Sequence, residues 1–166
     1  MRRQPNRDWR YYLSAVLGVL VMLALSPILV PLLILKVTHH WIRGVVLSWR
    51  FRRVWGSQGK VGVLVYSDSP NWKEYVEASL LPRVADRVVT INWSARSLWS
   101  DRKPLEVRVF EHWAGEHEFN PMAIIVPRRC KVCTVRFWQA FKDFKHGRPD
   151  ELHRQEALLL EAIDAA

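Results

Sequence analysis

Residues 13–35 read LSAVLGVLVMLALSPILVPLLIL, a run of 23 residues without a charged side chain. An α-helix rises about 1.5 Å per residue, so this run is long enough to cross a hydrocarbon core about 30 Å thick. A cleaved secretion signal has a shorter apolar region of roughly 7–15 residues, and no small-x-small cleavage site precedes Lys36. The run therefore predicts an uncleaved transmembrane helix over residues 13–35, in a single-pass membrane protein.

Two prolines interrupt the apolar run. Pro27 and Pro31 lie four residues apart, on one face of the predicted helix. Each proline removes a backbone donor and tends to kink a helix, so we expect a kinked single span. A re-entrant hairpin, with both ends on one side of the membrane, is the alternative. It requires protein around its bent backbone, because unpaired backbone groups are costly in lipid.

The net charge of +9 lies almost entirely around the apolar run. Residues 1–55 hold nine Lys and Arg and one acid, whereas residues 56–166 hold sixteen Lys and Arg and fifteen acids. Basic residues beside a span meet anionic headgroups and set its orientation, so a bilayer with anionic headgroups is the expected partner of this charge. The nearly neutral remainder gives a nucleic-acid function no support.

Both flanks of the run are basic. The N-terminal flank, residues 1–12, has four arginines, and the segment after the run has five Lys and Arg together with His39 and His40. The second flank is slightly richer in Lys and Arg, so the positive-inside rule favours a cytoplasmic C-terminal domain.

Residues 36–59 predict a helix on the membrane surface, followed by a linker at residues 56–59 (GSQG). One helical face, with i, i+3, i+4, i+7 spacing, holds Ile42, Val45, Val46 and Trp49. Tryptophan favours the membrane–water interface and arginine there reaches phosphate. We therefore expect six side chains at the interface: Trp41, Trp49, Arg50, Arg52, Arg53 and Trp55. The alternative is that the same apolar face packs on the soluble domain.

A strand–helix–strand unit follows the linker. Residues 61–66 (VGVLVY) are apolar and rich in β-branched side chains, as in a buried central strand. Ser69 and Pro70 predict the N-cap and first position of a helix over about residues 71–85. Residues 87–93 (RVVTINW) predict a second strand, and this spacing predicts that the two strands are parallel.

The rest of the chain completes one α/β domain over residues 60–166. Three segments predict strands: 105–110 (LEVRVF), 122–126 (MAIIV) and the start of 134–141 (TVRFWQAF), whose end is also compatible with a helical turn. Pro149 starts a last helix, with two acids at the positive end of its dipole. Its apolar face comprises Leu152, Leu159, Leu160 and Ile163.

This order of elements resembles a thioredoxin-like domain, in which a βαβ unit is followed by a β-hairpin and a closing helix. In that family the redox motif lies where the first strand meets its helix, and Ser69-Pro70-Asn71-Trp72 here occupies the position of Cys-Pro-x-Cys. The family's cis-proline before a central strand is matched by Asn120-Pro121. Because both redox cysteines are replaced, the resemblance implies the fold without its thiol–disulfide chemistry. A flavodoxin-like or other open sheet is the alternative.

The plan of the whole chain, an apolar anchor with basic flanks and a small domain, resembles membrane-anchored proteins of bacteria. That resemblance implies a location in the bacterial inner membrane.

The chain has one CxxC motif, formed by Cys130 and Cys133. The adjacent Arg128, Arg129 and Lys131 favour a reactive thiolate, whereas a structural zinc site would need two further ligands. Since the motif lies between two predicted strands and opens no helix, two ordinary thiols are the alternative.

Imidazoles and carboxylates crowd a second segment, EHWAGEHE at residues 111–118. His112, Glu116 and His117 are the metal-ligand candidates in it. Their spacing matches no established metal motif, and a solvated turn around Gly115 explains the same residues. We therefore expect neither a metal nor another cofactor.

Polar side chains follow both strands of the βαβ unit. Because the carboxyl ends of parallel strands meet at one edge, where ligands gather in open sheets, we expect these side chains to lie together. The predicted ligand or partner surface comprises Asp68, Ser69, Asn71, Trp72, Asn92, Ser94 and Arg96. Helix caps and turns are the alternative role for the same residues.

Tryptophan is abundant in the predicted domain, at positions 72, 93, 99, 113 and 138. Most of these side chains should be half-buried, and tryptophan near loop ends is typical of binding surfaces. With no catalytic constellation evident, the sequence predicts a membrane-anchored protein-binding or assembly module. The alternative is an anchored enzyme that uses the Cys130 and Cys133 thiols or a metal held by His112 and His117.

Overall fold

A computed structural model describes residues 8–99, 103–115, 120–128 and 131–166. The chain forms two compact units, Met1–Arg43 and Gly44–Ala166. One helix, α1 (Asp8–Val54), runs without interruption from the first unit into the second.

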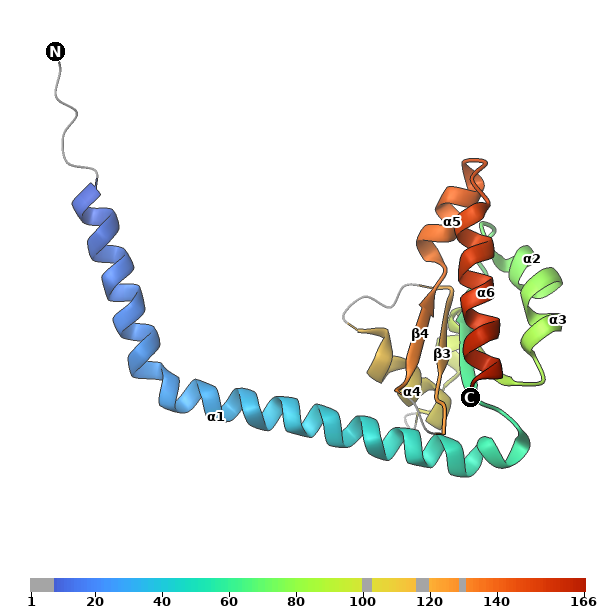
Figure 1. The fold of residues 1–166 in the computed structure, drawn as a ribbon, viewed down its shortest axis with the longest axis horizontal. Helices are drawn as coiled ribbons and strands as arrows, with labels where there is room; N and C mark the ends of the chain where they lie inside the picture. Colours follow the sequence, from blue (N-terminus) through green and yellow to red (C-terminus); the bar gives the residue numbers. More distant parts are fainter. Residues whose placement is uncertain (1–7, 100–102, 116–119, 129–130) are drawn as a thin grey trace, which may run out of the picture. The chain divides into compact units, whose positions relative to one another are not determined.

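The first unit consists, in its described part, of α1 alone. This helix holds the one segment among the described residues that is long and apolar enough to cross a membrane. Its large apolar side chains are exposed, for example Leu23 at 63% and Leu33 at 61%. Both prolines lie inside the helix, and Figure 1 shows a bend in its blue N-terminal part. The kinked helix is therefore observed, whereas an uninterrupted helix does not fit the re-entrant hairpin.

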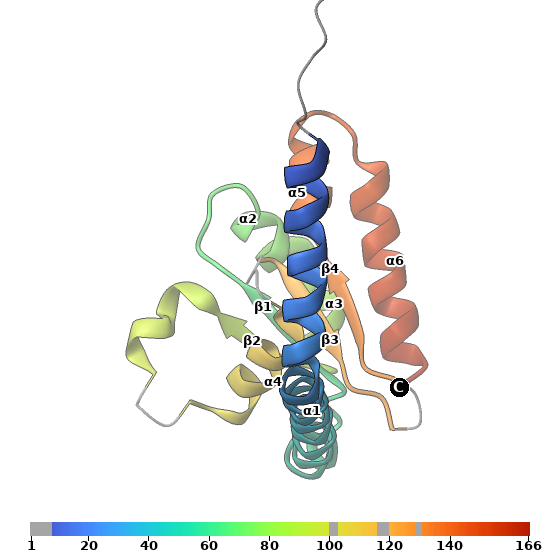
Figure 2. The same ribbon diagram turned by 90° about the vertical axis from the view of Figure 1, so that its left-hand side faces the viewer.

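The second unit is built on a mixed sheet in the order β2-β1-β3-β4. Its strands are β1 (Gly62–Tyr66), β2 (Val88–Asn92), β3 (Met122–Ile125) and β4 (Cys133–Arg136). β1 pairs in parallel with β2 and antiparallel with β3, and β3 pairs antiparallel with β4. Figure 2 shows β2 and β4 at the two edges of the sheet. The coarse expectation of an α/β fold is confirmed.

One face of the sheet is covered by helices that follow β1 and β4. These are the continuous turns α2 (Lys73–Tyr75), η2 (Val76–Leu80) and α3 (Leu81–Val84), then α5 (Trp138–Lys145) and α6 (Asp150–Asp164). Leu64 and Ala123 of the sheet pack there with Leu80, Phe137 and Leu159. The predicted last helix is confirmed, since Leu152, Leu159 and Ile163 are buried and Leu160 is partly buried.

The other face is covered by α4 (Leu105–Ala114) and the end of α1. Val63 and Val65 of β1 pack there with Leu47, Phe51 and Phe110. Figure 1 shows α4 on one side of the strands and α2 and α3 on the other. Since alternate residues of β1 face opposite layers, this strand is buried throughout, as its continuous apolar sequence predicts. Two short 3₁₀ segments, η1 (Gly56–Gln58) and η3 (Trp93–Leu98), complete the fold.

Residues 105–110 form the start of α4, so the strand predicted for LEVRVF is wrong. The buried side chains Val107, Phe110 and Ala114 recur at i, i+3 and i+7, which is a helical period that begins inside the alternating segment and ends beyond it. The helix that follows β1 also begins later than predicted. The N-cap of α2 is Trp72 rather than Ser69, and the carbonyl oxygen of Ser69 accepts from the backbone N–H of Lys73 at 3.0 Å.

The second half of α1 presents two different faces. Leu47, Ser48 and Phe51 are buried against the sheet, whereas Val45, Val46 and Trp49 are 46–57% exposed. The helix therefore does pack on the domain, but with the face opposite to the one weighed from the sequence. The helix passes close to α4, because a Cβ on Gly44 would lie 2.7 Å from Nε2 of His112.

The two faces of α1 should respond differently to truncation. Phe51→Ala is expected to lower the free energy of unfolding by about 3–5 kcal/mol, because it opens a cavity beneath the sheet. Trp49→Ala, a matched aromatic truncation two residues away on the exposed face, should change it by less than about 1 kcal/mol. Denaturant titration of the full chain in neutral detergent, followed by near-ultraviolet circular dichroism, measures both. Equal losses would contradict the assigned faces.

Candidate functional site

The predicted residues after β1 and β2 do come together. The backbone N–H of Asp68 donates to Oγ of Ser94 at 2.9 Å, and Nδ2 of Asn92 donates to Oδ1 of Asp68 at 3.1 Å. Oδ1 of Asn92 accepts from the backbone N–H of Ser94 at 2.9 Å, which caps η3. The carboxyl ends of two parallel strands are thus tied by side chains, as the edge position predicts. Nη1 of Arg96 donates to the carbonyl oxygen of Trp93 at 3.4 Å.

Asp68 also forms an ion pair, with Nζ of Lys73 2.7 Å from its Oδ1. Hydrogen bonds from Lys73 and then Asn92 lower the pKa of the Asp68 carboxyl below its ordinary value. The same pair raises the pKa of Lys73. A carboxylate held ionised in this way has no proton to donate near neutral pH, so this network suits a turn and a charged surface better than general acid catalysis.

Removing the cation tests this assignment. Lys73→Met should raise the pKa of Asp68 toward its ordinary value, since the largest cause of the lowering is lost. Because the folded pKa is the lower one, the stabilisation from this pair is present above the ordinary pKa and fades as pH falls through the lowered one. Carbon-13 NMR of the labelled carboxylates measures the titration. Lys142→Met, which removes a cation elsewhere, is the control, and an unchanged Asp68 pKa in Lys73→Met would contradict the assignment.

An aromatic cluster lies beside the Ser69-Pro70-Asn71-Trp72 turn. The ring of Phe141 lies 6.3 Å from that of Trp72 and 5.5 Å from that of Tyr75, and Phe144 lies 5.5 Å from Tyr75. Nε1 of Trp72 donates to Oγ of Ser67 at 3.2 Å. These contacts join the start of α2 to α5, a pairing for which the sequence carries no local signal.

A groove of about 420 Å³ opens between these elements and is termed here the aromatic groove. Its lining is Asn71, Trp72, Trp138, Phe141, Lys142, Lys145 and His146. Nζ of Lys142 lies 3.5 Å from the centre of the Trp138 ring, and Nζ of Lys145 donates to Oδ1 of Asn71 at 3.2 Å. Aromatic faces and cations thus line one concave surface. A second hollow of about 340 Å³ continues past Asn71 and Trp72 toward Tyr75 and Ser79.

A partly buried ion pair, between Arg83 and Glu156, lies next to Tyr75, whose ring contacts the groove residue Phe141. Glu156 of α6, only 6% exposed, accepts from the hydroxyl of Tyr75 at 2.8 Å and from Nη1 of Arg83 at 3.1 Å. Burial, followed by the hydrogen bond to Glu156, raises the pKa of Tyr75 to about 12. Tyr75 therefore stays a neutral hydrogen-bond donor at physiological pH and holds α2 against α6.

The thiol and metal candidates are only partly described. Cys133 is exposed at the first position of β4, opposite Ile125, and Cys130 lies outside the described residues. His112 lies on α4 with its ring 4.5 Å from that of Trp113, while Glu116 and His117 lie outside the described residues. Within the described part of the chain, no group of three or more His, Cys, Asp or Glu is placed to hold a metal.

The predicted interface residues divide between the two faces of α1. Trp41 and Trp49 are exposed at 68% and 57%, and the Arg53 guanidinium lies 5.4 Å from the centre of the Trp49 ring. Arg50 is also exposed. Trp55 and Arg52 are different, because Trp55 packs partly buried against the core and Arg52 donates to the carbonyl oxygen of Arg128. Arg52 lies on the side of α1 that faces the domain, and Trp55 follows the last residue of the helix.

Comparison of the chain with protein-family models, curated proteins and solved structures yields no match in any of the three.

Proposed function

We propose that this chain is a single-pass protein of a bacterial inner membrane whose cytoplasmic domain binds a protein partner through the aromatic groove. The observation that carries the proposal is the groove itself, which combines the partly exposed side chains of Trp72 and Trp138 with three basic side chains. Aromatic anchors surrounded by polar groups are characteristic of protein-binding surfaces.

The proposed anchor is the apolar part of α1. Its large apolar side chains are exposed throughout the described part of the first unit. An uncovered apolar helix of this kind needs lipid or another protein around it. The basic flanks support insertion with the domain on the cytoplasmic side.

Topology is testable with single cysteines. In a chain with Cys130→Ser and Cys133→Ser, Ala166→Cys should react with a membrane-impermeant maleimide only after the inner membrane is permeabilised. Gln4→Cys in the same background should react in intact cells, because a single span places the two ends on opposite sides. Reaction of Ala166→Cys in intact cells would show that the domain lies outside the cytoplasm, opposite to the proposed orientation. The same pattern at both positions would refute the single span.

A thioredoxin-like assignment for the domain is part of the proposal. It is supported by the βαβ unit, the antiparallel β3–β4 hairpin, the closing helix α6 and the cis peptide bond between Asn120 and Pro121 before β3. The Ser69–Trp72 turn then lies at the family's motif position and borders the aromatic groove. With serine and tryptophan where the family has cysteines, binding rather than thiol exchange is the role that this position supports.

The chemistry of the groove indicates the partner. Lys142, Lys145 and His146 favour acidic side chains, and the exposed parts of Trp72 and Trp138 favour apolar ones. Lys142 already lies over the Trp138 ring, so an incoming carboxylate meets a cation that is held in place. We expect the partner to present a polypeptide segment that alternates acidic with aromatic or aliphatic residues.

Peptide selection on the full chain in neutral nanodiscs tests this expectation. Selection from displayed random 12-residue peptides should enrich acidic and apolar sequences. Trp138→Ala or Lys142→Glu should lower the affinity of the chain for the selected peptides by about tenfold or more. Arg154→Glu on the exposed surface of α6 makes the same charge change as Lys142→Glu and serves as its control. Cys130→Ser with Cys133→Ser should leave affinity unchanged. Selected peptides that ignore the groove variants would refute the proposal.

A further inference from the structure

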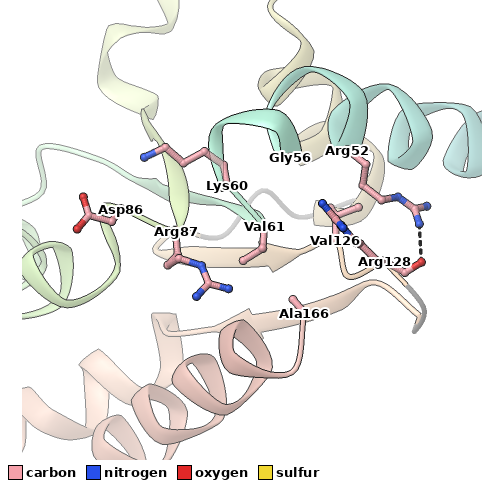
Figure 3. Close-up of a pocket in the computed structure, with 10 residues that line it drawn as sticks. Arg52, Gly56, Lys60, Val61, Asp86, Arg87, Val126, Arg128 and Ala166 are labelled. Atoms are coloured by element: carbon pink, nitrogen blue, oxygen red, sulfur yellow. Dashed lines mark hydrogen bonds between the residues drawn. The ribbon is translucent and has the colours of Figure 1, made fainter.

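Another hollow lies at the end of the sheet opposite to the aromatic groove, and Figure 3 shows the residues that line it. It is termed here the basic pocket and has a volume of about 400 Å³. Val61 just before β1, Arg87 just before β2 and Val126 just after β3 contribute to it, together with Arg52 near the end of α1. Ala166 lines it as well, so four separate segments of the sequence meet at this pocket.

The pocket is strongly cationic. Its lining includes Arg52, Lys60, Arg87 and Arg128, with Asp86 as the single acidic side chain. Figure 3 shows Asp86 at the edge of the view, with its carboxylate directed away from Arg52 and Arg128. Neighbouring cations repel one another in the absence of an anion, so this arrangement is favourable chiefly when negative charge enters the pocket.

The cations are held in place without being neutralised. Nη1 of Arg52 donates to the carbonyl oxygen of Arg128 at 2.9 Å, and Nη2 of Arg87 donates to that of Ile163 at 3.2 Å. Nζ of Lys60 donates to the carbonyl oxygen of Ala85 at 2.8 Å. Backbone carbonyls carry no net charge, and the ion pairs within the described residues engage other cations. Each guanidinium also keeps further N–H donors for a ligand.

A tetrahedral oxyanion suits this lining. Arginine offers a planar fork that binds phosphate with two parallel hydrogen bonds, and three arginines from different segments line this one hollow. The volume exceeds what a phosphate alone occupies and leaves room for a small polar group attached to it. Val61 and Val126 give the pocket apolar walls, against which the charged contacts are strengthened.

We propose that the basic pocket binds the phosphate of an anionic phospholipid headgroup. Arg52 belongs to both the pocket and α1, three residues after the exposed Trp49. If Val45, Val46 and Trp49 enter the bilayer surface, Arg52 lies on the flank of the helix at headgroup level. The pocket is then presented to the layer in which anionic phosphates are concentrated. The inference rests on the proposed membrane anchorage and is independent of the partner proposed for the aromatic groove.

Binding can be measured on the full chain in a neutral maltoside detergent. Dihexanoyl phosphatidylglycerol is titrated while the arginine Nε–Hε NMR signals are followed, in parallel with dihexanoyl phosphatidylcholine and inorganic phosphate. Phosphatidylglycerol should bind at least tenfold more tightly than phosphatidylcholine, whose choline offsets its phosphate charge. The signals of Arg52, Arg87 and Arg128 should shift together.

Variants then assign the site. Arg87→Gln and Arg128→Gln should each weaken phosphatidylglycerol binding by about tenfold or more, because each removes a charged pair of donors. Arg154→Gln removes the same charge from the surface of α6 and should have no effect. Arg128→Lys keeps the charge but not the fork, so an intermediate affinity is expected. Thermal unfolding of each variant shows whether the domain is intact, and Arg128→Lys provides a second test if Arg87→Gln unfolds.

Each remaining outcome overturns the proposal. Equal affinity for the two lipids would show that the pocket does not select anionic phosphate. Inorganic phosphate that competes as tightly as phosphatidylglycerol would identify a free phosphate compound as the ligand, and anchorage by α1 would then still stand. Tight phosphatidylglycerol binding unchanged in Arg87→Gln, Arg128→Gln and Arg128→Lys would assign the lipid site to another surface. The same labelling pattern at Gln4→Cys and Ala166→Cys would, separately, refute the single-span anchor.

Discussion

Burial of Leu47 and Phe51 against Val63 and Val65 is the interaction on which the second unit depends. The sheet has two apolar faces, and in the described part of the domain the second one is packed with α4 and with Trp93 and Trp99 at the two ends of η3. The last turns of α1 cover the same face. Consequently, the helix that carries the segment long and apolar enough to cross a membrane also contributes its last turns to the domain core, and the Gly56–Gly59 turn follows this contact.

The aromatic groove and the basic pocket differ in chemistry because they lie at opposite ends of the sheet. The aromatic groove lies beside the turn that follows β1, where helix starts and strand ends bring Trp72 close to α5. The basic pocket lies where β1 and β2 begin, next to the end of α1. Lipid phosphate and a polypeptide would therefore not compete for the same residues, and one could be bound while the other is held.

Much of the fold could be predicted from the sequence, because β1 and β3 are short apolar runs between turn signals and α6 has a clear helical period. The same reasoning located Asp68, Asn92 and Ser94, since parallel strands must end at a common edge. The prediction was wrong for LEVRVF, because its alternating apolar and polar residues indicated a strand where the chain forms α4, which covers the second face of the sheet. Trp138 was predicted only as one of five tryptophans typical of a binding surface. Lys142 and Arg87 could not be assigned to a site, because only tertiary packing brings them beside their partners.

The position of α1 ahead of β1 in the sequence has a consequence for biosynthesis. A ribosome completes Leu47 and Phe51 before it makes β1, and Val63 follows Phe51 by only twelve residues. The first strand therefore emerges next to a helix face that is already able to receive it, through a contact that closes a very short loop. Long-range pairing of β1 with β3 has to wait for some sixty further residues, and meanwhile the helix can shield one side of a strand that would otherwise be exposed to aggregation.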